Sequence, residues 1–235
     1  MKPEVRLLSG VRAVVFDAVG TLILPDPSAS VTYALVGRKF GSQLTPEAIT
    51  LRFLEAFARE EEVDRQRGWR TSEVREQERW RQIVGRVLDD VSDPESCFRE
   101  LFDHFSRPAA WRCDPEAAPL LAALKNGGFS LGLASNYDRR LRSVAAGLSP
   151  LNLFQHLIIS SEVGWRKPAP EFFAALCRRL DLPAEKILYV GDDLLNDYEG
   201  ARAAGLQAVL FDPQEKQRVA PVRRIGRLAD LQSVG

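Results

Sequence analysis

Four short apolar runs of this sequence lead into side chains that can do chemistry. A carboxylate, Asp17, follows the first run, and a hydroxyl, Ser135, follows the second. An ammonium group, Lys167, comes after the third in the stretch GWRKPAP, and the carboxylates Asp192 and Asp193 come after the fourth. Ligands of open parallel sheets bind beyond the carboxyl ends of the strands. We therefore expect these five side chains to converge on one crevice.

This combination suits attack by a carboxylate on a phosphate monoester. Such a nucleophile approaches a dianion, so positive charge must neutralise both partners. Mg²⁺ prefers hard oxygen ligands and several waters, which Asp17, Asp192 and a backbone carbonyl can provide together. Lys167 would hold Asp17 ionised and screen the phosphoryl charge. Ser135 and the backbone amide of Asn136 would bind a phosphoryl oxygen.

The elements that must position these residues alternate between strand and helix. Strands are expected in β-branched and apolar runs that end at turn residues, and helices where apolar residues recur at helical spacing. Such alternation predicts a parallel sheet covered on both faces, a Rossmann-like three-layer α/β core. The expected strands are 11–16, 129–134, 157–160, 187–190 and 207–211. The expected helices are 116–125, 139–146, 170–180 and 195–204, with a last short helix near Leu228 and Leu231.

The stretch between the first expected strand and residue 108 has a different pattern, of helix after helix. Its apolar residues recur at helical spacing, as at Leu51, Leu54 and Phe57. We expect residues 1–26 and 108–235 to form the core and residues 27–107 to form an inserted all-helical domain. Prolines that suit hinge linkers lie near its two crossings: Pro25, Pro27 and Pro108.

Four motifs of the chain resemble those of the haloacid dehalogenase superfamily. They occur in the family's order, and the resemblance spans nearly the whole chain, with the helical insertion at the place of the family's C1 cap. The stretches SNYDRRL and GWRKP are most similar to the branch called haloacid dehalogenase-like hydrolase domain-containing protein 3. The motifs are DAVGTL at 17–22, SN at 135–136, KP at 167–168 and GDDLLND at 191–197.

The resemblance implies a Mg²⁺-dependent phosphatase that acts on a small phosphorylated metabolite through an aspartyl phosphate on Asp17. It assigns the metal-binding backbone carbonyl to Val19, a role that survives any change of side chain. It places Asp193 and Asp197 in or near the second shell of the metal, where they orient its waters. The inserted domain would close over the substrate, exclude water and select the leaving group.

Val19 is the departure from the family's pattern. Phosphatases of the superfamily usually carry an Asp at this position, which protonates the leaving oxygen and then activates the attacking water. Valine can do neither, and loss of a positioned acid-base group typically costs about 10² to 10⁴ in rate. We expect slow turnover of poor leaving groups and persistent hydrolysis of activated substrates.

Two alternatives remain open beside the phosphatase, and a third, phosphonate cleavage, is nearly removed. A catalytically degenerate member would bind a phosphorylated metabolite or a protein partner without turnover. Dehalogenases of the superfamily also lack a carboxylate at the position of Val19, and they need no metal. Three carboxylates near Asp17, those of Asp192, Asp193 and Asp197, are costly without a cation, which favours the metal-dependent phosphatase over a dehalogenase. Phosphonate cleavage needs a lysine from the cap, and the segment 42–105 contains none.

Aromatic and basic residues outside the motifs are interpreted mainly as structural. Trp69, Trp80 and Trp111 are expected to fill a helical core, as aromatic residues of small helical domains usually do. Trp69 is the best exception, because Gly68 and a helix cap at Thr71 or Ser72 place it in a loop that can face the crevice. Arg139 and Arg140 begin a helix after Ser135 and are expected on the surface.

Composition excludes several classes of partner. The chain has 235 residues with 32 Lys and Arg against 32 Asp and Glu, so no basic excess favours nucleic acid. Its 3 cysteines form no zinc pattern and are interpreted as thiols of a reducing compartment. No apolar run approaches the length of a membrane span, so a cytoplasmic protein is expected. Patterning leaves the oligomeric state open, with a monomer slightly favoured.

Overall fold

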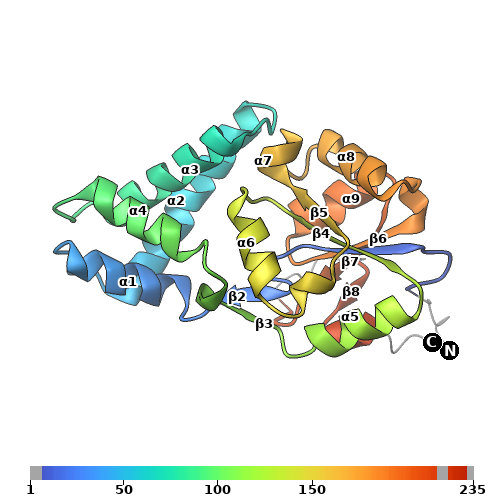
Figure 1. Ribbon diagram of the computed structural model, residues 1–235. Helices are drawn as coiled ribbons and strands as arrows, with labels where there is room; N and C mark the ends of the chain where they lie inside the picture. The colour runs from blue at the N-terminus through green and yellow to red at the C-terminus, as the bar shows by residue number, and fades with distance from the viewer. Residues whose placement is uncertain (1–6, 216–221, 232–235) are drawn as a thin grey trace.

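A six-stranded parallel sheet forms the centre of the protein, as the computed structural model shows for residues 7–215 and 222–231 (Figure 1). The strand order is β5-β4-β1-β6-β7-β8. The predicted α/β fold class is confirmed, and the five predicted strands appear with ends moved by two residues at most. Their bounds are β1 Ala13–Phe16, β4 Ser130–Ser135, β5 His156–Ile159, β6 Ile187–Gly191, β7 Gln207–Phe211 and β8 Arg224–Ile225.

Helices cover both faces of this sheet, which explains why its central strands are apolar throughout. Side chains of β1 alternate between two separate cores. Val14 and Phe16 pack with α5 (Ala117–Asn126) and α6 (Arg140–Gly147). Ala13 and Val15 pack on the opposite face with α8 and α9. The bounds of these two helices are Pro170–Leu180 and Gly200–Ala203.

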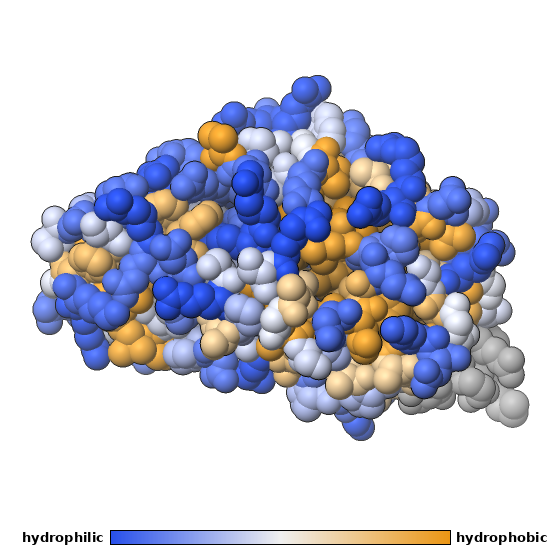
Figure 2. All heavy atoms as spheres, in the orientation of Figure 1, coloured by the Kyte–Doolittle hydropathy of each residue, from blue (hydrophilic) through white to orange (hydrophobic). Residues whose placement is uncertain are grey.

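A third apolar core lies within four helices inserted between β2 and β3. Figure 1 shows them together at one side of the molecule, and hydrophilic side chains predominate on their visible face (Figure 2). Tyr33, Ile49 and Ile83 are among the buried side chains that hold them together. We propose that residues 27–107 form a cap domain. The helices are α1 Ala29–Lys39, α2 Pro46–Gln66, α3 Glu73–Val87 and α4 Pro94–His104.

A short antiparallel pair joins the two crossings between the helices and the core. Ile23–Pro25 (β2) pairs with Trp111–Cys113 (β3), and Asp26 N donates to Ala110 O at 2.9 Å. Hinge prolines were predicted here but strands were not, because a strand of three residues is too short to show an alternating pattern. The ladder therefore holds the two crossing segments side by side.

The largest local difference from prediction lies at 195–204, where a single α-helix was expected. A π-helix at Leu194–Glu199 (η4) precedes α9, and the wider turn begins within the fourth motif. The short C-terminal helix appears as a 3₁₀ turn at Leu228–Leu231 (η5). Further short elements are η1 Pro108–Ala110, η2 Leu151–Leu153, α7 Ser160–Val163 and η3 Ala184–Lys186. Within the described part of the chain, no helix is long and apolar enough to cross a membrane.

Candidate active site

The carboxyl ends of β4, β1 and β6 bring the predicted site residues together. Asp17 directly follows β1, and its backbone N–H donates to Val190 O of β6 at 2.8 Å. Ser135 is the last residue of β4, and Asp192 follows the last residue of β6. Because these three strands are adjacent in the sheet, residues far apart in the sequence meet at its edge.

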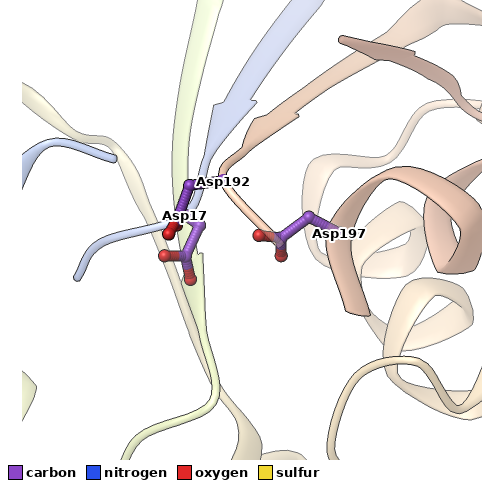
Figure 3. A group of neighbouring side chains, drawn as sticks. All are labelled: Asp17, Asp192 and Asp197. Carbon is purple, nitrogen blue, oxygen red and sulfur yellow. The ribbon is translucent and has the colours of Figure 1, made fainter. Parts of the chain in front are cut away.

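Three carboxylates crowd this edge. Asp17, Asp192 and Asp197 each offer an oxygen, and these oxygens lie within 4.8 Å of one another (Figure 3). Burial, followed by the charges of Asp17 and Asp197, raises the pKa of Asp192. Burial also raises the pKa of Asp197, although Lys167 opposes the shift. Protein interiors tolerate such a cluster of like charges when a cation lies among them. Hard carboxylate oxygens fit Mg²⁺, and all three residues are positioned to hold it.

Lys167 is buried among these carboxylates. Its Nζ donates to Asp17 Oδ1 and to Asp197 Oδ1, both at 2.6 Å. Burial alone would lower the pKa of Lys167, but the two carboxylates outweigh it and raise the pKa well above its usual value. The ammonium also donates to the hydroxyl of Tyr189 at 3.0 Å, and that hydroxyl donates to Ala134 O at 2.8 Å. Tyr189 was not predicted, although a Tyr inside a buried strand signals a polar partner for its hydroxyl.

Asn136 holds the backbone of Lys167 through its side chain. Its Nδ2 donates to Lys167 O at 3.0 Å, and Lys167 N donates to Asn136 Oδ1 at 2.8 Å. Only the backbone amide of Asn136 was predicted to bind the phosphoryl group. The paired hydrogen bonds give the side chain a positioning role as well, since they fix the loop that carries the ammonium.

The remaining predicted metal residues differ in placement. Asp193 lies apart from the three grouped carboxylates; its Oδ1 accepts from Leu195 N at 2.9 Å and Asn196 N at 2.8 Å, which caps η4. Val19 is half-buried and lines the cavity together with Asp17, and its side chain has no proton to offer. Thr21, another residue of the first motif, donates to Asp192 Oδ1 at 3.0 Å and was not predicted.

Gly20 shows why the first motif turns where it does. Its φ is +97°, and a Cβ at this position would lie 2.3 Å from Asp192 Oδ2. Only glycine combines this backbone conformation with so close an approach. Replacement by any other residue would displace the carboxylate that faces Asp17.

A cavity of about 380 Å³ opens from Asp17 toward the four-helix region. Its near end is lined by Asp17, Ser135 and Lys167. Trp80 and Trp111 line its far part, whereas Trp69 is absent from the wall. The expectation that Trp69 faces the crevice was therefore wrong. Its loop packs against the core through backbone hydrogen bonds, with Arg166 N donating to Trp69 O at 2.9 Å.

A buried ion network joins the four helices to the loop of Lys167. Arg166, the residue before Lys167, donates to Glu76 of α3, and both are almost fully buried. Arg79 of the same helix donates to Asp64 of α2 at 2.9 Å. Nothing in the sequence pattern had singled out these residues, because their pairing depends on three distant segments. The network ties the helices directly to Arg166, the residue beside Lys167.

Removal of one charge from this network should destabilise the fold. Glu76→Gln leaves Arg166 buried without its main anion, so we expect the free energy of unfolding to fall by about 3 kcal/mol in urea denaturation. Glu78→Gln on the same helix is the matched control: that side chain is 46% exposed and should cost less than about 1 kcal/mol. Equal effects of the two substitutions would contradict a stabilising network.

The loss of stability caused by Glu76→Gln should depend on pH. Burial by itself raises the pKa of Glu76, but Arg166 and Arg79 outweigh it and leave the pKa below its usual value. A lowered folded-state pKa stabilises the fold above the pKa of the unfolded chain. The difference between wild type and Glu76→Gln should therefore be full at neutral pH and fade as pH falls below about 4.

The sequence of residues 11–205 matches the family model for haloacid dehalogenase-like hydrolases. The chain belongs to this family. It is 27% identical over 232 residues to the human haloacid dehalogenase-like hydrolase domain-containing protein 3. This match covers 94% of the present chain and 92% of the human protein. A segment of 103 residues is 35% identical to the ribulose-1,5-bisphosphate 5-phosphatase of Halopiger xanaduensis and covers 43% of each chain.

Solved structures of the haloacid dehalogenase-like fold are also similar to this chain. L-2-haloacid dehalogenase from Xanthobacter autotrophicus superposes with a TM-score of 0.75 at 18% identity, over 95% of this chain and 98% of that one. A hydrolase of the same superfamily from Bacillus subtilis, bound to magnesium, gives 0.72 at 20% identity over 95% and 98%. At these identities the similarity establishes the fold.

Proposed function

We propose that this haloacid dehalogenase-like hydrolase is a Mg²⁺-dependent phosphatase that acts on a small phosphorylated metabolite through an aspartyl phosphate on Asp17. The observation that carries the proposal is the charge of the site. Asp17, Asp192 and Asp197 together bear three negative charges when ionised, and Lys167 supplies one positive charge. A divalent cation would neutralise the remainder and allow a phosphate dianion to approach.

The residues of the site would act in two displacement steps. In the first, Asp17 Oδ attacks phosphorus, a P–O bond to Asp17 forms, and the bond to the leaving oxygen breaks with its electron pair. Lys167 neutralises the carboxylate and screens the phosphoryl oxygens, while Ser135 and the amide of Asn136 bind one of them. In the second, water attacks phosphorus, the bond to Asp17 breaks, and inorganic phosphate leaves. Bound Mg²⁺ supplies electrostatic stabilisation of the phosphoryl charge in both steps.

Val19 limits both displacements. Val19 lines the cavity beside Asp17 and has no proton to donate to the leaving oxygen. The leaving group therefore departs as an anion, and the attacking water receives no help from residue 19. The proposed phosphatase should be slow on alkyl phosphates, since alkoxides are poor leaving groups.

Dehalogenation is the second candidate, and Val19 is the observation that favours it. Halide leaves without protonation, so that reaction needs no acid at residue 19. Against it stands the crowding of Asp192 and Asp197 around Asp17, which serves no purpose in a metal-free displacement of halide. The ribulose bisphosphatase relative also supports phosphate as the group transferred.

Withdrawal of magnesium is the test of this proposal. We expect hydrolysis of 4-nitrophenyl phosphate to fall by about 10²-fold or more when EDTA removes Mg²⁺, and to return when Mg²⁺ is restored. Chloride release from 2-chloropropionate, measured beside it, should stay at background. Chloride release that EDTA leaves unchanged would replace the phosphatase with a dehalogenase. Turnover of neither substrate would leave a binding protein.

A further inference from the structure

We infer that the leaving group of the substrate is an aromatic hydroxyl compound without further negative charge, as in a phenyl or naphthyl phosphate. This inference rests on the proposed phosphatase activity and names its substrate class. Three features of the structure carry it: the aromatic wall of the cavity, the pairing of every arginine on that wall, and Val19.

The far part of the cavity has a wall of aromatic rings. Phe53 and Phe57 of α2 stack with centroids 5.9 Å apart and an interplanar angle of 23°. Trp80 of α3 lies 6.4 Å from Phe53, between centroids. Aromatic faces favour a flat apolar ring in offset or edge-on contact over a hydrated sugar or polyol. The aromatic residues on the cavity wall are Tyr33, Phe53, Phe57, Trp80, Phe105, Trp111 and Tyr137.

Arginine side chains on this wall are already neutralised. Arg140, expected on the surface, is instead buried and donates through Nε and Nη2 to both oxygens of Asp138. Arg79 pairs with Asp64 and Arg166 with Glu76. A second phosphate or carboxylate on the leaving group would have to displace one of these buried carboxylates and leave it without its cation, which is unfavourable. Charge therefore disfavours bisphosphates and phosphorylated acids.

Val19 selects independently for the same class of leaving group. A phenol has a pKa near 10, as the tyrosine side chain does, so phenolate departs without a proton donor. An alkyl alcohol is a far weaker acid than a phenol, about as weak as water, so it depends on protonation as it leaves. The missing acid and the aromatic wall thus both favour an aryl phosphate. In an enzyme for sugar phosphates, the first would slow the departure of the alcohol and the second would bind the sugar poorly.

Three probes separate recognition of the ring from reactivity of the leaving group. 2-Naphthyl phosphate has an aromatic leaving group, acetyl phosphate has a reactive one without a ring, and glycerol 3-phosphate has neither. With Mg²⁺ present, we expect a KM for 2-naphthyl phosphate about tenfold or more below that for acetyl phosphate. The kcat for both should exceed that for glycerol 3-phosphate by about 10²-fold.

Substitutions in the aromatic wall of the cavity test whether these rings bind the naphthyl group. Trp80→Leu should raise the KM for 2-naphthyl phosphate about tenfold and leave the KM for acetyl phosphate within about twofold. Leu54→Ala on α2, where the side chain is 62% exposed, is the matched control and should change neither. Phe57→Leu gives a second test if Trp80→Leu fails to fold. Equal KM values for the two probes in the wild type, or insensitivity of naphthyl binding to both wall variants, would overturn the inference.

Failure of the proposed function has a different signature. If none of the three phosphates is turned over, titration calorimetry with Mg²⁺ still measures their binding. Tight binding of 2-naphthyl phosphate, with none of glycerol 3-phosphate, would sustain the aromatic site while the phosphatase fails. Binding of both with equal affinity would overturn the aromatic site.

Discussion

Asp17→Asn should reduce phosphate release from 2-naphthyl phosphate by about 10⁴-fold or more, because an amide oxygen cannot attack phosphorus. The fold should survive the change. Asn still accepts a hydrogen bond from Lys167 Nζ, which lies 2.6 Å from Asp17 Oδ1, and it removes a charge from a crowded carboxylate cluster. Single-turnover and steady-state phosphate assays measure the loss, and thermal denaturation checks the fold.

Asp193→Asn is the matched control for this prediction. Both carboxylates follow strands of the same sheet edge, but Asp193 caps η4 and lies outside the grouped carboxylates. Asn caps a helix about as well as Asp, so stability should hold and turnover should change less than about tenfold. A residual rate above about one hundredth of wild type in Asp17→Asn would show that another group is the nucleophile.

Val19→Asp should raise turnover, with the gain largest for the poorest leaving group. A carboxyl at this half-buried position on the cavity wall can protonate the leaving oxygen and later activate water. We expect kcat for glycerol 3-phosphate to rise about 10²-fold and kcat for 2-naphthyl phosphate to rise less than about tenfold. Initial rates on the two substrates measure the difference.

Val19→Asn controls for polarity and shape in that experiment. It has nearly the same volume as Asp but offers no acidic proton, so it should leave both rates near wild type. If Val19→Asp gains no more than Val19→Asn on glycerol 3-phosphate, acid-base chemistry at residue 19 is not what limits turnover. An equal gain on both substrates would separate the effect from leaving-group reactivity.

The order of strands and helices in the core was predictable from sequence because short-range patterns carry it. Fully buried parallel strands consist of continuous apolar runs, so Ile187–Gly191 and Gln207–Phe211 stood out with correct or nearly correct ends. β2 and β3 were missed because three residues are too few for a pattern, and their pairing links positions almost 90 residues apart. The π-helix at 194–199 was missed because a wide turn has no periodicity of its own.

The residues of the candidate site were also only partly predictable from the sequence, for the same reason. Asp17 and Asp192 were recognisable because each directly follows a strand, and parallel strands meet at one edge. Lys167 comes after β5 and α7 and was recognisable from its KP motif. Tyr189, Thr21 and the Arg166–Glu76 pair were not, because their partners come from distant segments. The assignment of roles to Ser135 and to the backbone of Asn136 and Val19 remains a prediction.

Sequence by itself therefore determined which residues can do chemistry here, the fold that gathers them, and the absence of a carboxylate at residue 19. Only the tertiary structure decided what surrounds that chemistry. Trp80 and Trp111 face the cavity while Trp69 does not, and Arg140 is neutralised inside the wall. The physical reason is that strand-end chemistry follows from local pattern, whereas the lining of a cavity depends on how separate elements pack against one another.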